Sequence, residues 1–287
     1  MELRGRATVR VGRTGVRVAA VTLCVALALF SLPASLRGTQ NPPEQARDSR
    51  ATLEQDVAAL RVAAEQGAAT AQNSLGNAYA NGTGVLRDLS EAVRWFRRAA
   101  DQGFAIAQTN LGLAYTHGVG VVADAEQAVR WFRLAADQAE ATAQYHVAIA
   151  YAEGSVVPLE ATTAVEWFRL AADQGHAGAQ YNLGIAYANG LGVSEDISTG
   201  VEWFRRAAEQ GHAGAQGNLG IAYSNGIGVP RDPTVAAQWY LLAGERGYAP
   251  ARDYLMELET IMSRDDLAEA MRRAEEWTPT RSPGTRP

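Results

Sequence analysis

The chain of 287 residues is long enough for one large core or for one elongated repeat domain. All 26 basic residues are Arg, and with 31 Asp and Glu residues they give a net charge of −5. Six Arg and only one Glu lie in residues 1–37, which leaves 20 Arg against 30 acidic residues in the rest of the chain. Because phosphate binding draws its affinity from a basic surface, this acidic body argues against a nucleic-acid partner.

Residues 1–36 are predicted to be a signal peptide or a membrane anchor. Five Arg precede an uncharged run from Val18 to Leu36, whose strongly apolar part ends at Leu32. About 15 apolar residues after a basic segment are typical of a secretory signal, whereas a membrane span needs about 20. Since Leu32-Pro33-Ala34 is a poor cleavage site, a cleaved signal, an uncleaved anchor and a buried soluble helix all stay open. In the first two cases, the Arg residues keep the N-terminus cytoplasmic and send the body across the bacterial cytoplasmic membrane into the periplasm.

The next two segments lead into the folded body. Residues 37–50, which include Pro42 and Pro43, are predicted to be a flexible linker. Residues 51–66 match the second helix of the repeats that follow, with Ala59 at the position of a repeated Trp and Gly67 at the stop. We expect this helix to cap the N-terminal end of the repeat array.

A 36-residue period organises the chain from about residue 71 to residue 250. The stretch AQYNLGIAY at residues 179–187 returns as AQGNLGIAY at residues 215–223, and each block continues through Gly-x-Gly-Val to a Trp. A period of this length is typical of stacked helical units that share one continuous core. Five Trp residues, each 36 positions apart, mark the expected structural core of the repeats: Trp95, Trp131, Trp167, Trp203 and Trp239.

Each unit is predicted to form two helices joined by a short loop. Ala179, Leu183 and Tyr187 are four residues apart and therefore lie on one face of the first helix. Gly190 follows at the helix stop, and Asp196 is placed to accept hydrogen bonds from the free N–H groups of the second helix. The sequence therefore predicts an all-α fold: a right-handed α-solenoid of five helix-turn-helix repeats, with partial capping helices at both ends, over residues 51–277.

The C-terminal end carries its own cap. Residues 251–262 are expected to form a degenerate first helix, and residues 265–277 a final helix whose polar residues face water. The Pro-rich tail, residues 278–287, is predicted to be disordered.

Small residues at fixed positions of the repeat indicate tight packing. Glycine inside a helix costs about 1 kcal/mol relative to alanine, so we expect another element to approach closely at the recurring mid-helix glycines. Ala139 replaces the glycine that ends the second helix in other repeats. Since a positive φ costs alanine about 1 kcal/mol or more, we expect the helix before Ala139 to end differently. The mid-helix glycines are Gly76, Gly112, Gly184 and Gly220.

The recurring pattern resembles the Sel-1-like repeat family, a relative of the tetratricopeptide repeats. The resemblance rests on Ala-Gln-x-Asn-Leu-Gly-x-Ala-Tyr, Gly-x-Gly-Val, an acidic cap and Ala-x-x-Trp-Phe-x-x-Ala-Ala-x-Gln-Gly, in register over residues 51–277. It implies an adaptor or scaffold that presents a concave groove to peptides or partner proteins. The paired cysteines of one branch of the family are missing here, so nothing peculiar to that branch transfers.

The candidate binding surface is the first-helix face turned about 200° from the packed one. Aromatic and aliphatic side chains flanked by Asn are typical of a peptide-docking stripe. The alternative is that these side chains fill contacts between neighbouring first helices. The candidate residues on this concave face are Leu113, His117, Tyr145, Ile149, Glu153, Tyr181, Ile185, Asn189, Ile221 and Asn225.

No group of residues in the sequence indicates catalysis, a metal or a cofactor. The Gly-x-Gly-Val loops follow no strand and lack a third glycine, so they fit turns better than phosphate binding. His176 and His212 recur in equivalent turns about 10 Å apart, too far to share a zinc ion, and the only thiol is that of Cys24. Acidic residues at the ends of second helices are placed to pair with Arg four positions earlier, namely Asp101, Asp137, Asp173 and Glu209 with Arg97, Arg133, Arg169 and Arg205.

These observations predict a non-catalytic protein-protein interaction scaffold of the bacterial envelope that binds a protein or peptide in the concave groove. The alternative is a carbohydrate-associated envelope or exopolysaccharide assembly factor, because Tyr and Asn on one face can also stack on and hydrogen-bond to a glycan. An enzyme is not expected, because catalysis needs convergent polar groups. We expect no cofactor, and contact with the membrane only through the N-terminal segment.

Overall fold

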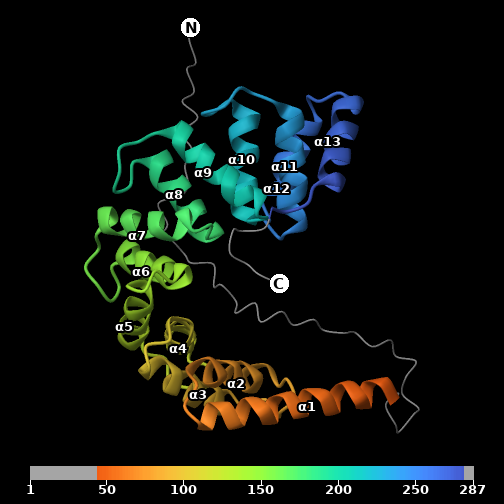
Figure 1. The fold of residues 1–287 in the computed structure, drawn as a ribbon. Coiled ribbons are helices and arrows are strands. Elements are labelled where there is room, and N and C mark those ends of the chain that lie inside the picture. Colours follow the sequence, from red (N-terminus) through yellow and green to blue (C-terminus); the bar gives the residue numbers. More distant parts are fainter. Residues whose placement is uncertain (1–43, 281–287) are drawn as a thin grey trace.

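The structure, a computed structural model, describes residues 44–280, with side chains from residue 52 onward. Within this range it consists of thirteen helices without strands, stacked one after another along an arc (Figure 1). Ten of the helices form five pairs, so the predicted all-α solenoid is confirmed. The pairs are α2 (Ala69–Asn81) with α3 (Leu89–Asp101), α4 (Ala105–His117) with α5 (Ala125–Ala136), α6 (Ala141–Glu153) with α7 (Ala161–Asp173), α8 (Ala177–Asn189) with α9 (Ile197–Glu209), and α10 (Ala213–Asn225) with α11 (Pro233–Glu245).

The N-terminal cap, α1 (Glu44–Glu65), is longer than predicted. Because it begins at Glu44, residues 44–50 are helical and are not part of a flexible linker. This segment contains good helix formers, and Pro43 stands before the helix, where its missing N–H interrupts no helical hydrogen bond. The predicted signal or anchor, Cys24 and the end of the tail lie outside the described residues. No helix within residues 44–280 is long and apolar enough to cross a membrane.

The C-terminal end is closed by α12 (Ala251–Glu259) and α13 (Arg264–Glu276). The final helix buries Ala270 and Ala274, which pack with residues of α11. Its outer face is exposed, and there Arg272 and Arg273 pair with Glu269. The terminal helices therefore cover the apolar end of the array, as a cap must.

An aromatic ring fills the interior of each repeat. It belongs to the residue that follows the repeated Trp, as in Phe204, and the equivalent residue of the last repeat is Tyr240. A Cβ added to Gly184 would lie 2.5 Å from the ring of Phe204, so the first helix and the ring are in direct contact. The same holds at Gly76, Gly112 and Gly220, which confirms the predicted close approach at these glycines.

Three of the five repeated Trp residues are less buried than predicted. Only Trp95 and Trp239 are buried, whereas Trp131, Trp167 and Trp203 are partly exposed. Trp203, for example, packs against a buried cluster that contains residues of the preceding repeat, Phe168 among them, and residues of α8. These three Trp residues therefore pack against clusters that extend into the preceding repeat and stay partly exposed, whereas the aromatic residue after each Trp is buried.

Ala139 keeps the backbone conformation of the glycine that it replaces. Its φ is 63°, in the left-handed region, beside 86° at Gly103 and 90° at Gly175. Although α5 ends one residue early, the N–H of Ala139 still donates to the carbonyl of Ala136 at 2.9 Å, as in the equivalent turns. The expected difference at this helix end is therefore limited to one residue, and Ala139 does not avoid the positive φ, because the hydrogen bonds of the turn hold it in this strained conformation.

The expected ion pairs at the ends of the second helices do not form. Arg133 instead donates to the hydroxyl of Tyr151 in the next repeat at 2.6 Å, and its guanidinium lies 5.6 Å from the centroid of that ring. Arg97 and Arg169 make the same contacts with Tyr115 and Tyr187. A ring contact to the next repeat therefore replaces a weak pair within one exposed helix.

Candidate functional site

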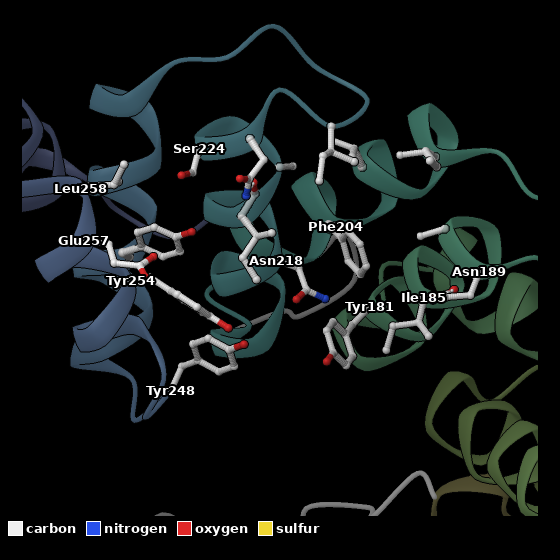
Figure 2. A pocket seen from close by; sticks show the side chains of 18 of the residues that line it. Tyr181, Ile185, Asn189, Phe204, Asn218, Ser224, Tyr248, Tyr254, Glu257 and Leu258 are labelled. Atoms are coloured by element: carbon white, nitrogen blue, oxygen red, sulfur yellow. Dashed lines mark hydrogen bonds between the residues drawn. The ribbon is translucent and has the colours of Figure 1, made fainter. Parts of the chain in front are cut away.

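A cavity of about 570 Å³ lies between α8, α10 and α12, with α9 and α11 behind them (Figure 2). We call it the C-terminal pocket. Its walls are mainly apolar and aromatic, and Asn189, Asn218 and Asn225 contribute amide groups. Five of the ten predicted concave-face residues line it: Tyr181, Ile185, Asn189, Ile221 and Asn225.

The other five candidates lie on α4 and α6, away from the pocket. Leu113, Tyr145 and Ile149 are partly buried, whereas His117 and Glu153 are exposed. The structure therefore brings the candidates of the fourth and fifth repeats together around one cavity and leaves those of the second and third outside it.

Two of the candidate tyrosines also pack between neighbouring repeats. The ring of Tyr145 stacks on His176 and that of Tyr181 on His212, with centroids 4.5 Å apart in both cases. These contacts match the alternative considered from the sequence, in which the side chains fill space between repeats. Tyr181 does both, because another part of the residue lines the pocket.

The histidines of the turns serve as helix caps. Nδ1 of His176 accepts a hydrogen bond from the N–H of Ala179 at 3.2 Å, and His212 caps α10 in the same way. Burial lowers the pKa of both imidazoles, and it lowers the pKa of His146, stacked on Phe132, to about 4. Within residues 44–280, no group of three or more His, Cys, Asp or Glu residues could hold a metal ion.

Several pocket residues escaped the sequence prediction: Asn218, Tyr240, Tyr248, Tyr254 and Glu257. Tyr248 lies in the turn that ends the last repeat, and Tyr254 and Glu257 belong to the degenerate helix α12. The sequence did mark these three residues, because each differs from the residue 36 positions earlier.

The polar chemistry of the pocket is that of phenols, amides and one carboxylate. Burial raises the pKa of Tyr248 to about 12 and also raises the pKa of Tyr181 and Tyr240, so these hydroxyls stay protonated at neutral pH. Glu257 is exposed at the rim. The described residues that line the cavity include no Arg or His, so its fixed charge at neutral pH is negative.

The order of the helices agrees with a known repeat unit. A family model described as Sel1 repeat matches the chain five times without a gap, at residues 69–104, 105–140, 141–176, 177–212 and 213–248. Each match contains one first helix, its loop, one second helix and the following turn. The chain belongs to the Sel1 repeat family. The C-terminal pocket therefore lies where the last two Sel1 repeats meet the capping helix α12.

Similar folds occur among solved structures. The chain is 33% identical to the Sel1 repeat protein from Oxalobacter formigenes, with a TM-score of 0.65 over 74% of this chain and 86% of that one. It is 27% identical to c5321, a protective antigen of uropathogenic Escherichia coli with an SLR fold, with a TM-score of 0.42 over 76% and 62%. The immunity protein PA5088 from Pseudomonas aeruginosa is 20% identical, with a TM-score of 0.48 over 73% and 81%. No curated protein matches the chain.

Proposed function

We propose that the protein is a non-catalytic scaffold that binds a peptide or protein partner in the C-terminal pocket. The observation that carries this proposal is the cavity of about 570 Å³, in which half of the predicted concave-face residues meet apolar, aromatic and amide side chains. Ligand sites of about 300–1,000 Å³ are commonly apolar with a few placed polar groups. Solenoids use such extended inner surfaces to bind partners.

The proposed place of action is the periplasmic side of the bacterial cytoplasmic membrane. The motive is the run of five Arg before the uncharged segment from Val18 to Leu36. N-terminal sequencing of protein from fractionated cells tests it. A mature N-terminus after residue 32 in the periplasmic fraction supports a cleaved signal, an intact N-terminus in membranes supports an anchor, and intact protein in the cytoplasm contradicts both.

A carbohydrate ligand is the second candidate, because Tyr and Asn side chains line the same pocket. Aromatic rings can stack on sugar faces, and amides can pair with hydroxyl groups. A glycan array separates the two candidates. Strong binding of an oligosaccharide that depends on Tyr254 favours the carbohydrate candidate over the peptide one.

Site-specific photocrosslinking in cells tests the scaffold proposal. With a photoreactive residue in place of Asn225 at the pocket, we expect a discrete adduct with one partner protein. The same residue in place of Leu170, which is half exposed on α7 outside the pocket, should not give that adduct.

A blocking variant provides the control. Ile221→Arg places a long charged side chain in the cavity and should abolish the adduct, while circular dichroism reports retained helicity. An adduct that persists in Ile221→Arg, or that forms equally from position 170, would contradict binding in the pocket.

A further inference from the structure

Several departures from the repeat pattern meet in the C-terminal pocket. Glu257 stands 36 positions after Ile221, which itself follows Ile185 at the same spacing, so an acid replaces a recurring aliphatic residue. Three tyrosines also replace other residues of the pattern, and all of them line the cavity. These replacements are Tyr240 for Phe204, Tyr248 for His212 and Tyr254 for Asn218.

A further departure, Gly217, makes room for one of these rings. In the preceding repeat the equivalent residue is Tyr181, whose ring stacks on His212. A Cβ on Gly217 would lie 2.3 Å from Cε1 of Tyr248, so this ring lies directly against α10 at the glycine. The glycine therefore permits the position of Tyr248 at the pocket.

The arrangement has the chemistry of a cation site. Tyr240 is buried, and its ring packs against Tyr254 with the centroids 5.3 Å apart. The partly exposed rings are those of Tyr248 and Tyr254, and Figure 2 shows Glu257 beside Tyr254, with Tyr248 on the same side of the cavity. The face of an aromatic ring attracts a cation within about 6 Å of its centre, and a carboxylate adds a charge-assisted hydrogen bond. Among the described lining residues no cation competes for these groups.

We propose that the C-terminal pocket binds an extended segment of a partner protein through an Arg or Lys side chain, held between the rings of Tyr248 and Tyr254 and the carboxylate of Glu257. This inference rests on the proposed scaffold function and specifies its partner. Charge complementarity supports this occupant, because the chain after residue 37 carries 30 acidic residues against 20 Arg. The cavity of about 570 Å³ exceeds the size of one side chain, and its Asn residues add amide groups to the lining.

Two peptides that differ only in charge test the proposal on the full chain. The probes are Ac-Ala-Ala-Arg-Ala-Ala-NH2 and the same peptide with citrulline, the neutral isostere of Arg, and calorimetry measures both affinities. The Arg peptide should bind about tenfold more tightly, which is the scale of a partly desolvated cation–π contact with an ion pair. A higher salt concentration should lower the affinity for the Arg peptide and leave the affinity for the citrulline peptide unchanged.

Two variants assign the preference to the pocket. Glu257→Gln should bring the Arg peptide close to the affinity of the citrulline peptide, whereas Glu259→Gln, on an exposed residue of the same helix outside the pocket, should change nothing. Tyr254→Leu should also reduce the preference, and Tyr254→Phe should retain it because the ring face stays. Circular dichroism verifies the fold of each variant.

The possible failures are distinguishable. Equal affinities for the two peptides would overturn the cation site and leave the scaffold function standing, whereas no binding of either would count against both. A preference that survives in Glu257→Gln and Tyr254→Leu would overturn the assigned site. Tighter binding of cellohexaose than of either peptide would overturn it in favour of a sugar. Tighter binding of residues 2–17 of this chain would make its own basic segment the occupant.

Discussion

Ala139 is the one residue other than glycine that has a positive φ in the described range. The left-handed conformation costs an L-residue roughly 1–2 kcal/mol, and the turn keeps this conformation because its hydrogen bonds are those of the neighbouring repeats. Alanine normally avoids the left-handed region, but here the packing of the repeats on either side of Ala139 outweighs that preference.

Ala139→Gly should therefore stabilise the protein by about 1 kcal/mol, measured as the free energy of unfolding in urea. Gly103→Ala is the matched reverse change, because a Cβ there would meet nothing within 4 Å, so only the φ of 86° is strained. It should destabilise by a similar amount. An unchanged or lower stability for Ala139→Gly would contradict the idea of stored strain.

Single residues also limited what could be predicted of the site. Trp and Phe are adjacent in the second helix, and the sequence of one repeat does not show which of the two is buried. That depends on how one repeat stacks on the next. Arg133 was expected to pair within its helix, and its contact with Tyr151 likewise depends on inter-repeat geometry. Local signals, by contrast, predicted the cap Asp196, whose carboxylate accepts from the N–H of Thr199 at 3.0 Å.

At the scale of helices, the stacking of first helices depends on uncharged imidazoles. His146 stacks on Phe132, and His176 and His212 accept hydrogen bonds at the starts of α8 and α10. Among the neighbouring titratable groups, His176 and His117 oppose the charged form of His146, and Glu140 partly favours the charged form of His176. Burial is the largest cause in each case, so the folded state holds these groups neutral.

Stability should fall as the pH drops from about 6.5 towards 4. The folded-state pKa of His146 is about 4, below its ordinary 6.5, so the unfolded chain binds more protons in this window and acid favours unfolding. The full shift corresponds to about 3 kcal/mol. His146→Asn removes this imidazole and should reduce the difference in unfolding free energy between pH 7 and pH 4.5 by about 1–3 kcal/mol. Asn is the chosen replacement because it occupies the equivalent position of the next repeat, at 182.

The exposed His117 supplies the control for this titration. His117→Asn should change the pH dependence much less than His146→Asn does, because the charge of His117 is the smallest of the causes that lower the pKa of His146. If His146→Asn and His117→Asn behave alike, acid sensitivity comes from the carboxylates of the chain, and the neutral histidines do not contribute.

At the scale of the whole molecule, the repeats are joined by a ladder of hydrogen bonds between a buried and a more exposed glutamine. The side chain of Gln210 donates to Oε1 of Gln180 at 2.7 Å, and Gln180 donates to the carbonyl of Ala172 at 3.1 Å. The bond between glutamines recurs in earlier repeats and stops after Gln210, since Arg246 stands at the next equivalent position, whereas Gln216 still donates to the carbonyl of Ala208 at 3.1 Å. Stability therefore adds up from contacts between neighbours.

The sequence period predicted the number of repeats and the order of their helices, and half of the ten predicted concave-face residues line the pocket. The period could not predict the pocket itself, because residues that depart from the pattern form part of its lining. These are residues of α12 and Tyr248, whose ring lies against α10 at Gly217. Such a surface is found by comparing each residue with the residues 36 positions away, because a consensus of the repeats leaves out the residues that differ.

The central claim is that the partner binds the face of the first helices at the C-terminal end. Hydrogen exchange of the full chain, free and bound to the partner identified by crosslinking, tests it most directly. We predict new protection confined to residues 181–189, 217–225 and 248–261. Protection confined to the second helices α3, α5 and α7, or none in these three segments, would contradict the account.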